Sequence, residues 1–427
     1  MKLLIKNGRL IDPCSNIDDT LDILIEDGKI KEIKEKIQDK EAEVIDATRL
    51  VVCPGFIDIH THLREPGRED EETIESGSQA AAAGGFTSIC CMANTEPPND
   101  KKEVTEFILR RSKEIGIVNV FPVASVTKGL KGEEITEMAE LKENGAVAFS
   151  DDGVSVKDSL VLRRAMEWIK MLNSVLIEHP EDSILSDEGV MNEGYYSVNY
   201  GLKGIPSESE EIIVSRDVII ARMTGAKLHF AHISTKGGVE ILREAKKKKI
   251  PVTAEVTPHH LILNESNLIP WESNHKMNPP LRSEEDRKYL IEALKDGTID
   301  VIATDHAPHT EDEKAVEFNL APFGVVGLET AVSLILDKLV HRGMITLQRM
   351  VDAISCRPAK ILNLKGKGKI AVGYDGDLTL LNLQKEIIID KNKFFSKGKN
   401  TPFHGWKLKG RTEITISGGR VVWMAKK

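Results

Sequence analysis

A chain of 427 residues with 41% hydrophobic and 29% charged residues has the composition of a globular protein and is long enough for more than one domain. Its formal net charge of -9 argues against a primary role in nucleic-acid binding, which normally depends on a basic surface. The sequence also contains no uninterrupted apolar run of the roughly 18 residues that a membrane helix needs.

The N-terminus and the cysteines favour a cytoplasmic protein. The first residues, MKLLIKNGRLIDP, become charged after three apolar residues and do not resemble a secretory signal. The cysteines are odd in number and form no C-x-x-C pair, and Cys90 and Cys91 lie inside an apolar run. We therefore expect reduced cysteines, a cytoplasmic location, and no membrane or nucleic-acid partner.

Both ends of the chain predict short strands. Asn7-Gly8 and Asp27-Gly28 lie between alternating apolar residues, which is a strong signal for a β-hairpin. The stretches 376–383 and 412–424 have the same character, and the second contains Gly418-Gly419 at its turn. Because these ends flank a different middle, we predict one small β-sandwich domain formed by both termini, residues 1–52 and 365–427.

The middle of the chain alternates between short apolar runs and segments with helical spacing. The apolar runs lie at 56–60, 87–94, the region of residue 121, 146–151, 175–179, 228–233, 251–257 and 301–306. Buried strands that alternate with amphipathic helices are typical of a parallel sheet, and eight such units predict an α/β fold with a (β/α)8 TIM-like barrel over residues 53–364. A doubly wound open sheet is the alternative, but its expected Gly-rich first turn is poorly matched by AGGFT at 83–87.

Residues that can bind a cation follow five of these predicted strands. They are His60 and His62, Asp151 and Asp152, His179, His232, and Asp305 with His306. The active site of a barrel lies at the carboxyl ends of its strands, so these side chains are expected to meet. In a strand, residues two apart face the same side, so His60, His62 and, if the strand continues, Arg64 would share one face. Nitrogen and carboxylate ligands together suit Zn²⁺ best, with Mn²⁺, Co²⁺ or Fe²⁺ as substitutes.

Each motif alone also has an ordinary structural explanation. An H-x-H pair can be two hydrogen-bonded histidines, EHPED can begin a helix, and SDDG is a turn signal. Separate structural needs would not place His or Asp at the same end of so many strands, so the joint pattern predicts a metal site. We expect His259 and His260 in a loop near the mouth of this site, and His306 on the opposite face of its strand.

Motifs along essentially the whole chain resemble the cyclic amidohydrolase family and, within it, the bacterial class I dihydroorotases. The matching segments are PGFIDIHTHLREPG, AFSDDGVSV, EHPED, HFAHIST, EVTPHHL, KMNPPLR, ATDHAPH, APFGVVGLETA and NTPFHGWKLKGR. H-x-H marks only the wider superfamily, whereas HLREPG, NPPLR and DHAPH together with PFGVVGLET are close to specific. Two positions depart from the usual pattern, Ala93 in MANT and Pro180 in EHPED, and neither replaces a ligand.

The resemblance implies one or two zinc ions per subunit, in a binuclear site. His60, His62 and Asp305 would hold the first ion. His179 and His232 would hold the second. Asp152 would bridge the two ions, in the place that many amidohydrolases give to a carboxylated lysine.

The resemblance also implies a substrate and a reaction. The reaction is the reversible cyclisation of N-carbamoyl-L-aspartate to L-dihydroorotate in de novo pyrimidine (UMP) biosynthesis. A hydroxide shared by the two ions would attack the ring amide, and Asp305 would act as general base and then acid. The substrate-binding residues would be His62, Arg64, Asn94, Asn278 and His309, with backbone contacts from Phe323 and Gly324.

Two other functions compete with this one. Another cyclic amidase, such as a hydantoinase or allantoinase, usually carries the carboxylated lysine, so the aspartate here counts against it. A non-catalytic subunit associated with aspartate transcarbamoylase would have lost metal ligands, whereas all six are present here. An active enzyme that also associates with aspartate transcarbamoylase, and that forms a homo-oligomer, agrees with the same sequence.

Overall fold

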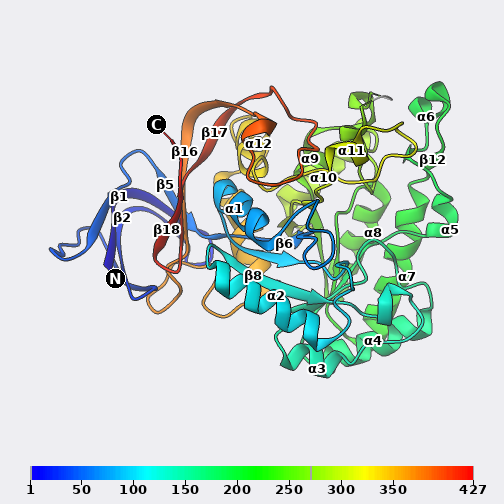
Figure 1. Ribbon diagram of the computed structural model, residues 1–427, viewed down its shortest axis with the longest axis horizontal. Helices are drawn as coiled ribbons and strands as arrows, with labels where there is room; N and C mark the ends of the chain where they lie inside the picture. Colours follow the sequence, from blue (N-terminus) through cyan, green and yellow to red (C-terminus); the bar gives the residue numbers. More distant parts are fainter. Residues whose placement is uncertain (1, 270–271, 427) are drawn as a thin grey trace.

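The computed structural model describes residues 2–269 and 272–426, and its larger part is a barrel (Figure 1). Its parallel strands follow one another in chain order, interrupted only by the separate pair β11 and β12. An isolated parallel bridge between Thr61 and His306 links the two ends of the sheet and nearly closes it. The predicted TIM-like barrel is therefore confirmed. Its strands are β6 (Phe56–Thr61), β7 (Phe86–Cys91), β8 (Asn119–Ala124), β9 (Ala148–Phe149), β10 (Leu176–Glu178), β13 (Leu228–Phe230), β14 (Val252–Val256) and β15 (Val301–Ile302).

Amphipathic helices with defined ends surround the barrel. Before α10, the Ser283 side chain accepts a hydrogen bond from the Asp286 amide, and Gly297 ends the helix in the left-handed conformation. Apolar side chains of these helices pack on the strands in one large core. The outer helices are α1 (Ile74–Gly84), α2 (Lys102–Ile115), α3 (Met138–Glu143), α4 (Ser159–Met171), α7 (Glu208–Thr224), α8 (Lys236–Lys247), α10 (Glu284–Asp296), α12 (Ala331–Ile335) continued by η4 (Leu336–Val340), and the run α13 (Leu347–Val351), η5 (Asp352–Cys356) and α14 (Arg357–Ile361).

Shorter elements lie in the loops that connect these units. They are η1 (Lys128–Leu130), α5 (Ser183–Ser186), β11 (Met191–Asn192), α6 (Tyr195–Tyr200), β12 (Gly204–Ile205), α9 (Pro258–Ile262), η2 (Glu265–Asn267), η3 (Ser273–His275), α11 (Glu311–Lys314) and η6 (Lys391–Lys393). In the part of the chain that the structure describes, no helix has the length and apolar character required to cross a bilayer.

Strands from both ends of the chain form a second, mainly antiparallel sheet, at the left of Figure 1. β5 lies parallel to β1 on one side and antiparallel to β16 on the other, so it joins the N-terminal strands to the C-terminal ones. A separate apolar core belongs to this sheet. The strands are β1 (Lys2–Asp12), β2 (Ile17–Glu26), β3 (Lys29–Lys34), β4 (Glu43–Asp46), β5 (Val51–Pro54), β16 (Leu378–Ile388), β17 (Lys407–Ser417) and β18 (Arg420–Met424).

The turns of this terminal sheet agree only in part with the prediction. Asp27-Gly28 joins β2 to β3 and Gly418-Gly419 joins β17 to β18, as expected. The hairpin predicted at Asn7-Gly8 is wrong, because β1 continues through it with a shift of register. Glycine is needed there for a different reason: a Cβ atom on Gly8 would lie 2.5 Å from the Val52 side chain of β5.

Three threonine hydroxyls connect the terminal sheet to the barrel. Thr379 of β16 and Thr412 and Thr415 of β17 donate hydrogen bonds to carbonyl oxygens at the C-terminal end of α1, at 2.6, 2.9 and 2.6 Å. The last carbonyls of a helix have no partner within the helix itself. The terminal sheet therefore adds to the cap that α1 already receives from the Gly85 amide, which donates to the Ala81 and Ala82 carbonyls.

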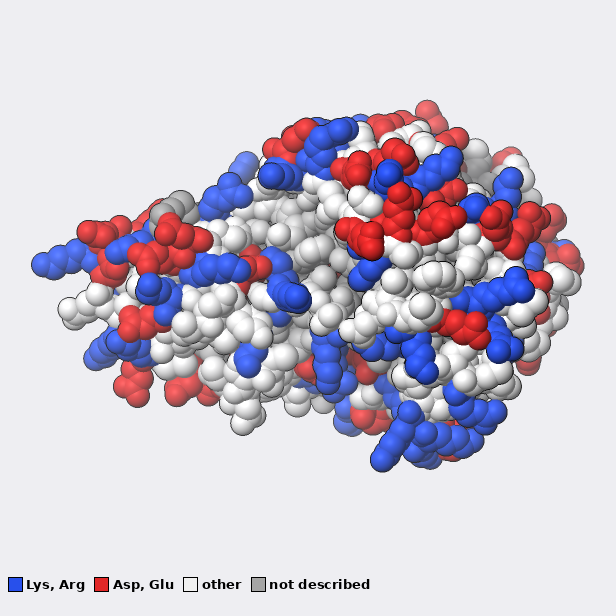
Figure 2. All heavy atoms as spheres, turned by 90° about the horizontal axis from the view of Figure 1, so that it is seen from below, with Lys and Arg blue, Asp and Glu red and all other residues white. Residues whose placement is uncertain are grey.

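Charged side chains of both signs lie on the face of the molecule seen in Figure 2, mixed over the terminal sheet at the left, with more acidic ones toward the upper edge of the barrel and more basic ones toward its lower edge at the right. This mixture agrees with the moderate net charge of -9. It differs from the single-sign basic stripe that is typical of a nucleic-acid-binding surface.

Candidate active site

The six predicted metal ligands meet at the carboxyl ends of the barrel strands. Asp152 lies centrally among them, with its Oδ1 atom 3.2 Å from His60 Nε2 and its Oδ2 atom 3.4 Å from His62 Nε2. Asp305 Oδ1 lies 3.1 Å from His62 Nε2 and 3.5 Å from His60 Nε2. The strands β6, β9 and β15, or the residues directly after them, therefore bring four of the predicted side chains into one cluster.

The other two histidines approach the same aspartate from β10 and β13. His179 Nδ1 and His232 Nε2 lie 3.0 Å apart, and they lie 3.7 and 3.8 Å from Asp152 Oδ1. Two sets of ligand atoms in this cluster lie within 4.8 Å of one another: His60, His62 and Asp305 form one, and His60, Asp152 and His232 form the other.

The donor atoms of this cluster fit a divalent metal ion. His60 Nε2 and Asp152 Oδ1 are buried and have no hydrogen-bond partner among the residues that the structure describes. Buried polar atoms without partners are costly, and a cation held by both would satisfy them. Imidazole nitrogens together with carboxylate oxygens form a ligand set that suits Zn²⁺ or a similar transition metal.

Backbone strain accumulates around the cluster. Arg64, His232 and Asp305 have positive φ angles of 60°, 29° and 49°, a region that residues with a Cβ atom seldom occupy. Such conformations cost of order 1–3 kcal/mol each and occur often at functional sites. β6 ends at Thr61 and the chain turns, so the continuing strand on which Arg64 would share a face with His60 and His62 is not present. This turn, rather than the strand, directs Arg64 toward the cluster.

One cavity of about 260 Å³ unites the metal cluster with the predicted substrate-binding residues. Ligand pockets are commonly roughly 300–1,000 Å³ in volume, so this cavity suits a small metabolite. Its walls are formed by His62, Arg64, Asn94, Asp152, Gly153, His179, His232, Asn278, Asp305, Ala307, His309, Phe323 and Gly324. Every predicted site residue except His60 lines it, and His60 is fully buried behind it.

A buried glutamate, Glu71, fixes the side chains at the end of the cavity that is distant from the metal cluster. No pattern in the sequence indicated this role. Glu71 is 1% exposed, and its Oε2 atom lies 2.8 Å from Arg64 Nε. Its Oε1 atom lies 2.9 Å from His309 Nδ1 and 2.9 Å from an Arg68 nitrogen. One carboxylate therefore fixes both Arg64 and His309. Glu71 stands in an acid-rich segment, REDEETIE, where no pattern distinguishes it from its neighbours.

Side-chain amides and a second glutamate orient the histidines. His62 Nδ1 donates a hydrogen bond to Asn94 Oδ1 at 2.9 Å, so its Nε2 atom faces the cluster. His179 Nε2 donates to Glu181 Oε2 at 3.0 Å, and Asn278 donates to the same oxygen at 2.7 Å. Asn94 thus contacts the predicted ligand His62 directly, and Asn278 is linked to the predicted ligand His179 through the Glu181 carboxylate. The role of Glu181 was missed because EHPED also matches a helix start.

The segment at Phe323-Gly324 closes one wall of the cavity. His309 Nε2 donates to the Phe323 carbonyl at 2.8 Å, and the Gly324 amide donates to the Lys276 carbonyl at 3.0 Å. Gly324 has a φ angle of 132°, and a Cβ atom there would lie 2.8 Å from Ala307 Cβ. Only glycine fits this position without displacing the wall.

Glu255 of β14 supports His60 from behind. Its Oε1 atom accepts a hydrogen bond from His60 Nδ1 at 2.6 Å, and its Oε2 atom lies 3.1 Å from His229 Nε2. A carboxylate in this position fixes the tautomer of a histidine that binds metal through its other nitrogen. The signal for Glu255 was present in PVTAEVT, where one charge stands in a buried strand.

We expect Glu255→Gln to weaken metal affinity by about 10- to 100-fold, because an outer carboxylate is typically worth that much to a metal site. Titration of the metal-free protein measures the change. Glu178→Gln is the matched control, since burial raises the pKa of the Glu178 carboxyl and the neutral amide resembles its protonated form. Equal losses in the two variants would contradict a specific role of Glu255.

Charges within the cluster shift its pKa values. Burial opposes the charge on His179, but the neighbouring carboxylates of Asp152 and Glu181 outweigh it and raise its pKa to about 10. Burial likewise opposes the charge on His60, while Asp152 and Glu255 raise its pKa. Burial would raise the pKa of Asp152, yet His60, His179 and His232 hold it well below its ordinary value. The Asp152 carboxylate is therefore ionised, and His60 and His179 carry protons at neutral pH when no metal is bound.

A metal ion must displace those protons, so its affinity should depend on pH. At pH 7 His179 is protonated without metal, because its pKa is about 10. Raising the pH toward that value removes the competing proton, and metal affinity should rise roughly tenfold per pH unit for each displaced proton. Competition with a chelator between pH 6.5 and 8.5 measures this slope. An affinity that does not change with pH would refute the protonated metal-free state.

The remaining expectations concern residues outside the cavity. His306 contacts Glu72 Oε2 at 3.1 Å and so lies away from the cluster, as expected. His259 and His260 do not lie in the expected loop: they are buried in α9, where His260 Nε2 donates to the Pro279 carbonyl at 2.9 Å. Burial lowers the pKa of His259 to about 4, so its ring is neutral.

Some known proteins are similar to this chain in sequence, and others are similar to it in fold. The family model described as Dihydro-orotase-like matches residues 49–238. The chain is 50% identical to the dihydroorotase of Caldanaerobacter subterraneus subsp. tengcongensis, over 100% of this chain and 98% of that protein, and 50% identical to the dihydroorotase of Geobacter metallireducens, over 99% and 100%. Among solved structures, L-hydantoinase from Arthrobacter aurescens is similar with a TM-score of 0.89 and 26% identity, over 100% of this chain and 96% of that chain.

Proposed function

Since the chain belongs to the dihydroorotase family, we propose that it catalyses the reversible cyclisation of N-carbamoyl-L-aspartate to L-dihydroorotate in pyrimidine biosynthesis. One observation carries this proposal. The cavity that contains the His and Asp cluster also contains Arg64, so a cyclic amide and a carboxylate can be bound at the same time. A carboxylate on the ring is the feature that distinguishes dihydroorotate from neutral cyclic amides.

The metal that we propose is zinc. His60, His62 and Asp305 would hold one ion, and His179 and His232 would hold a second, with Asp152 between them. A bound divalent ion lowers the pKa of a water molecule and polarises a carbonyl group, which is the chemistry that amide hydrolysis requires.

Asp305 is the group that we propose to move the proton. Its pKa is held below the ordinary value, against the effect of burial, by the charges of His60 and His62. The carboxylate is therefore ionised and can accept a proton from the attacking water. It then delivers that proton to the ring nitrogen as the amide bond breaks, and the reverse transfers occur in ring closure.

Arg64 and its neighbours would orient the substrate. The guanidinium is a planar fork that matches a carboxylate with two parallel hydrogen bonds. Its Nε atom donates to the Pro308 carbonyl at 3.3 Å and lies 2.8 Å from Glu71 Oε2, so the direction of the fork is set before substrate enters. Asn94, Asn278 and His309 would add polar contacts, and the backbone at Phe323-Gly324 would complete the wall.

The same observations support the two alternative functions, another cyclic amidase and a non-catalytic subunit, less well. Hydantoinases are similar in fold, but their sequence identity to this chain is about half that of the dihydroorotases. The central bridging position here is Asp152 rather than a carboxylated lysine. A non-catalytic subunit would not need all six ligands. Association with aspartate transcarbamoylase, assembly into a homo-oligomer and a cytoplasmic location remain predictions.

A turnover assay on L-dihydroorotate, with hydantoin and allantoin in parallel and metal analysis of the same sample, tests the proposal. We expect turnover of dihydroorotate, kcat/KM at least 10²-fold lower for the neutral rings, and zinc bound to the protein. Comparable rates on a neutral ring would refute the substrate assignment. Full activity after complete metal removal would refute the metal assignment.

A further inference from the structure

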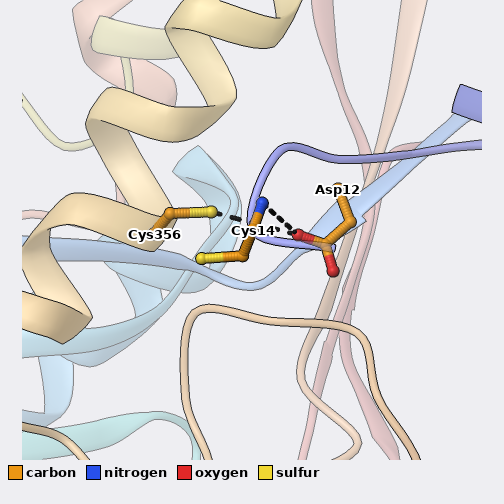
Figure 3. Close-up of side chains that lie close together, drawn as sticks. All are labelled: Asp12, Cys14 and Cys356. Atoms are coloured by element: carbon orange, nitrogen blue, oxygen red, sulfur yellow. Dashed lines mark hydrogen bonds between the residues drawn. The ribbon is translucent and has the colours of Figure 1, made fainter. Parts of the chain in front are cut away.

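Two cysteines lie side by side where the terminal sheet meets the barrel, and neither lines the cavity of the candidate active site (Figure 3). Cys14 stands in the turn between β1 and β2, and Cys356 is the last residue of η5. Their sulfur atoms and one carboxylate oxygen of Asp12 lie within 4.8 Å of one another. Cys14 is exposed, whereas Cys356 is only 4% exposed. An accessible thiol is therefore paired with a protected one.

The surroundings favour a thiolate at Cys14, whereas the neighbouring Cys14 and burial raise the pKa of the Cys356 thiol. Both cysteines line a cavity of about 790 Å³, and the same walls carry Lys29, Lys360, Lys365, Lys367 and Lys369. Nearby positive charge stabilises a thiolate, and reactive cysteines occur in partly exposed electropositive places of this kind. The neighbouring Cys356 thiol and Lys369 lower the pKa of Cys14, and burial and the carboxylates of Asp12 and Asp352 oppose this effect only in part.

The other cysteines of the chain have the opposite environment. Cys53, Cys90 and Cys91 are fully buried, and burial raises the pKa of Cys91 to about 12. Buried thiols in apolar surroundings are unreactive. They provide an internal comparison, because any reagent that reacts with thiolates should distinguish Cys14 from these three.

We propose that Cys14 and Cys356 form a site of reversible thiol oxidation, in which Cys14 reacts with a hydroperoxide and Cys356 resolves the product to a disulfide. The Cys14 thiolate attacks one peroxide oxygen, the O–O bond breaks, and the departing oxygen takes up a proton as water or an alcohol. Cys14 is left as a sulfenic acid. The Cys356 sulfur then attacks the Cys14 sulfur, the S–O bond breaks, and water leaves with the Cys356 proton. Two thiols are oxidised by two electrons, and the peroxide is reduced by two.

A metal ion is the competing occupant of these three residues, and the contacts of Asp12 disfavour it. Its Oδ1 atom accepts a hydrogen bond from the Cys14 amide at 2.9 Å. Its Oδ2 atom accepts bonds from the Ile370 amide at 2.9 Å and from Ser15 Oγ at 2.5 Å. Both oxygens are already used to hold the turn, and a lysine-lined cavity repels a cation. The thiols, rather than a three-ligand metal site, are the reactive feature.

The disulfide would change how the two parts of the molecule are joined. Cys14 belongs to the terminal sheet, and Cys356 belongs to the helical run that packs on β6 and β15 of the barrel. A bond between residues so distant in sequence restricts the unfolded chain strongly. The oxidised protein should therefore unfold at a higher temperature than the reduced one. This inference does not depend on the proposed function.

The test uses the full-length protein purified with its metal. The reduced protein is treated with a small molar excess of hydrogen peroxide, free thiols are alkylated, and intact and peptide masses are measured. We expect the loss of two hydrogen atoms, a linked peptide containing residues 14 and 356, a Tm higher by several degrees, and reversal of both changes by dithiothreitol. Alkylation should show that Cys53, Cys90 and Cys91 remain reduced.

Two conservative variants and a metal titration make the result decisive. Cys356→Ser should leave Cys14 as a sulfenic acid that a dimedone probe captures, and Cys14→Ser should show neither the linkage nor the rise in Tm. Equal oxidation of Cys14 and the three buried cysteines would overturn the proposal. So would cadmium or zinc binding at one equivalent that needs both thiols and survives addition of peroxide.

Discussion

Asp305→Asn is expected to lower kcat by about 10³-fold, within the range for loss of a positioned acid–base group. The amide keeps the size of the side chain and one oxygen that can face a metal ion, but it cannot accept and return a proton. Asp305 Oδ1 lies 3.1 Å from His62 Nε2, so the replacement should also leave the histidines in place. Steady-state kinetics in both reaction directions, with metal content measured on the same samples, give the result.

Asp300→Asn is the matched control for this experiment, because Asp300 precedes the same strand at its opposite end. There it accepts a hydrogen bond from the Ala254 amide at 3.0 Å and pairs with Lys246 at 2.5 Å. Its loss should lower stability and leave kcat within a few-fold. If Asp305→Asn retains a tenth or more of the normal kcat with full metal content, another group moves the proton.

Arg64→Ala is expected to raise KM by roughly 10²-fold with little change in metal content. Hydrogen bonds to charged groups contribute about 1.5–3 kcal/mol each, and the fork of Arg64 can offer two to a carboxylate. Arg64→Lys should recover only part of this loss, because an ammonium lacks the planar pair of donors. Initial rates over a wide range of substrate concentration separate KM from kcat.

The control for Arg64 is Arg68→Ala. Arg68 contacts the same carboxylate, Glu71, at 2.9 Å, but it does not line the cavity. If both variants raise KM equally, the effect of Arg64 passes through Glu71 and not through the substrate. Loss of metal in Arg64→Ala would contradict the assignment in a different way, since it would place Arg64 among the supports of the metal cluster.

The barrel and its metal cluster could be predicted from the sequence because each rests on a short-range pattern. The buried strands are continuous apolar runs, and a residue at the end of each run is fixed in space by the fold class. His60 and His62 are two apart within or directly after one strand, so their common direction follows from strand geometry. The position of Asp152 follows from the same rule on β9.

Features that depend on the chain leaving a strand could not be predicted in this way. Arg64 was expected on the face of β6, but a turn with positive φ places it in the cavity. Asn7-Gly8 matches the sequence pattern of a hairpin turn, yet contact with β5 keeps it within a strand. Glu71 and Glu181 act through partners distant in sequence, and a single sequence carries no record of such contacts.

The three threonine hydroxyls that cap α1 bear on how the whole chain unfolds. Pulling the terminal sheet away would take the threonine partners from the Gly84 and Gly85 carbonyls, each at a cost of roughly 1–3 kcal/mol, and would expose the apolar face beneath. Separation of the two parts is therefore costly. The molecule should behave as one cooperative unit, with a single calorimetric transition. A shortened gene that encodes only the barrel would then yield an insoluble product rather than a smaller enzyme.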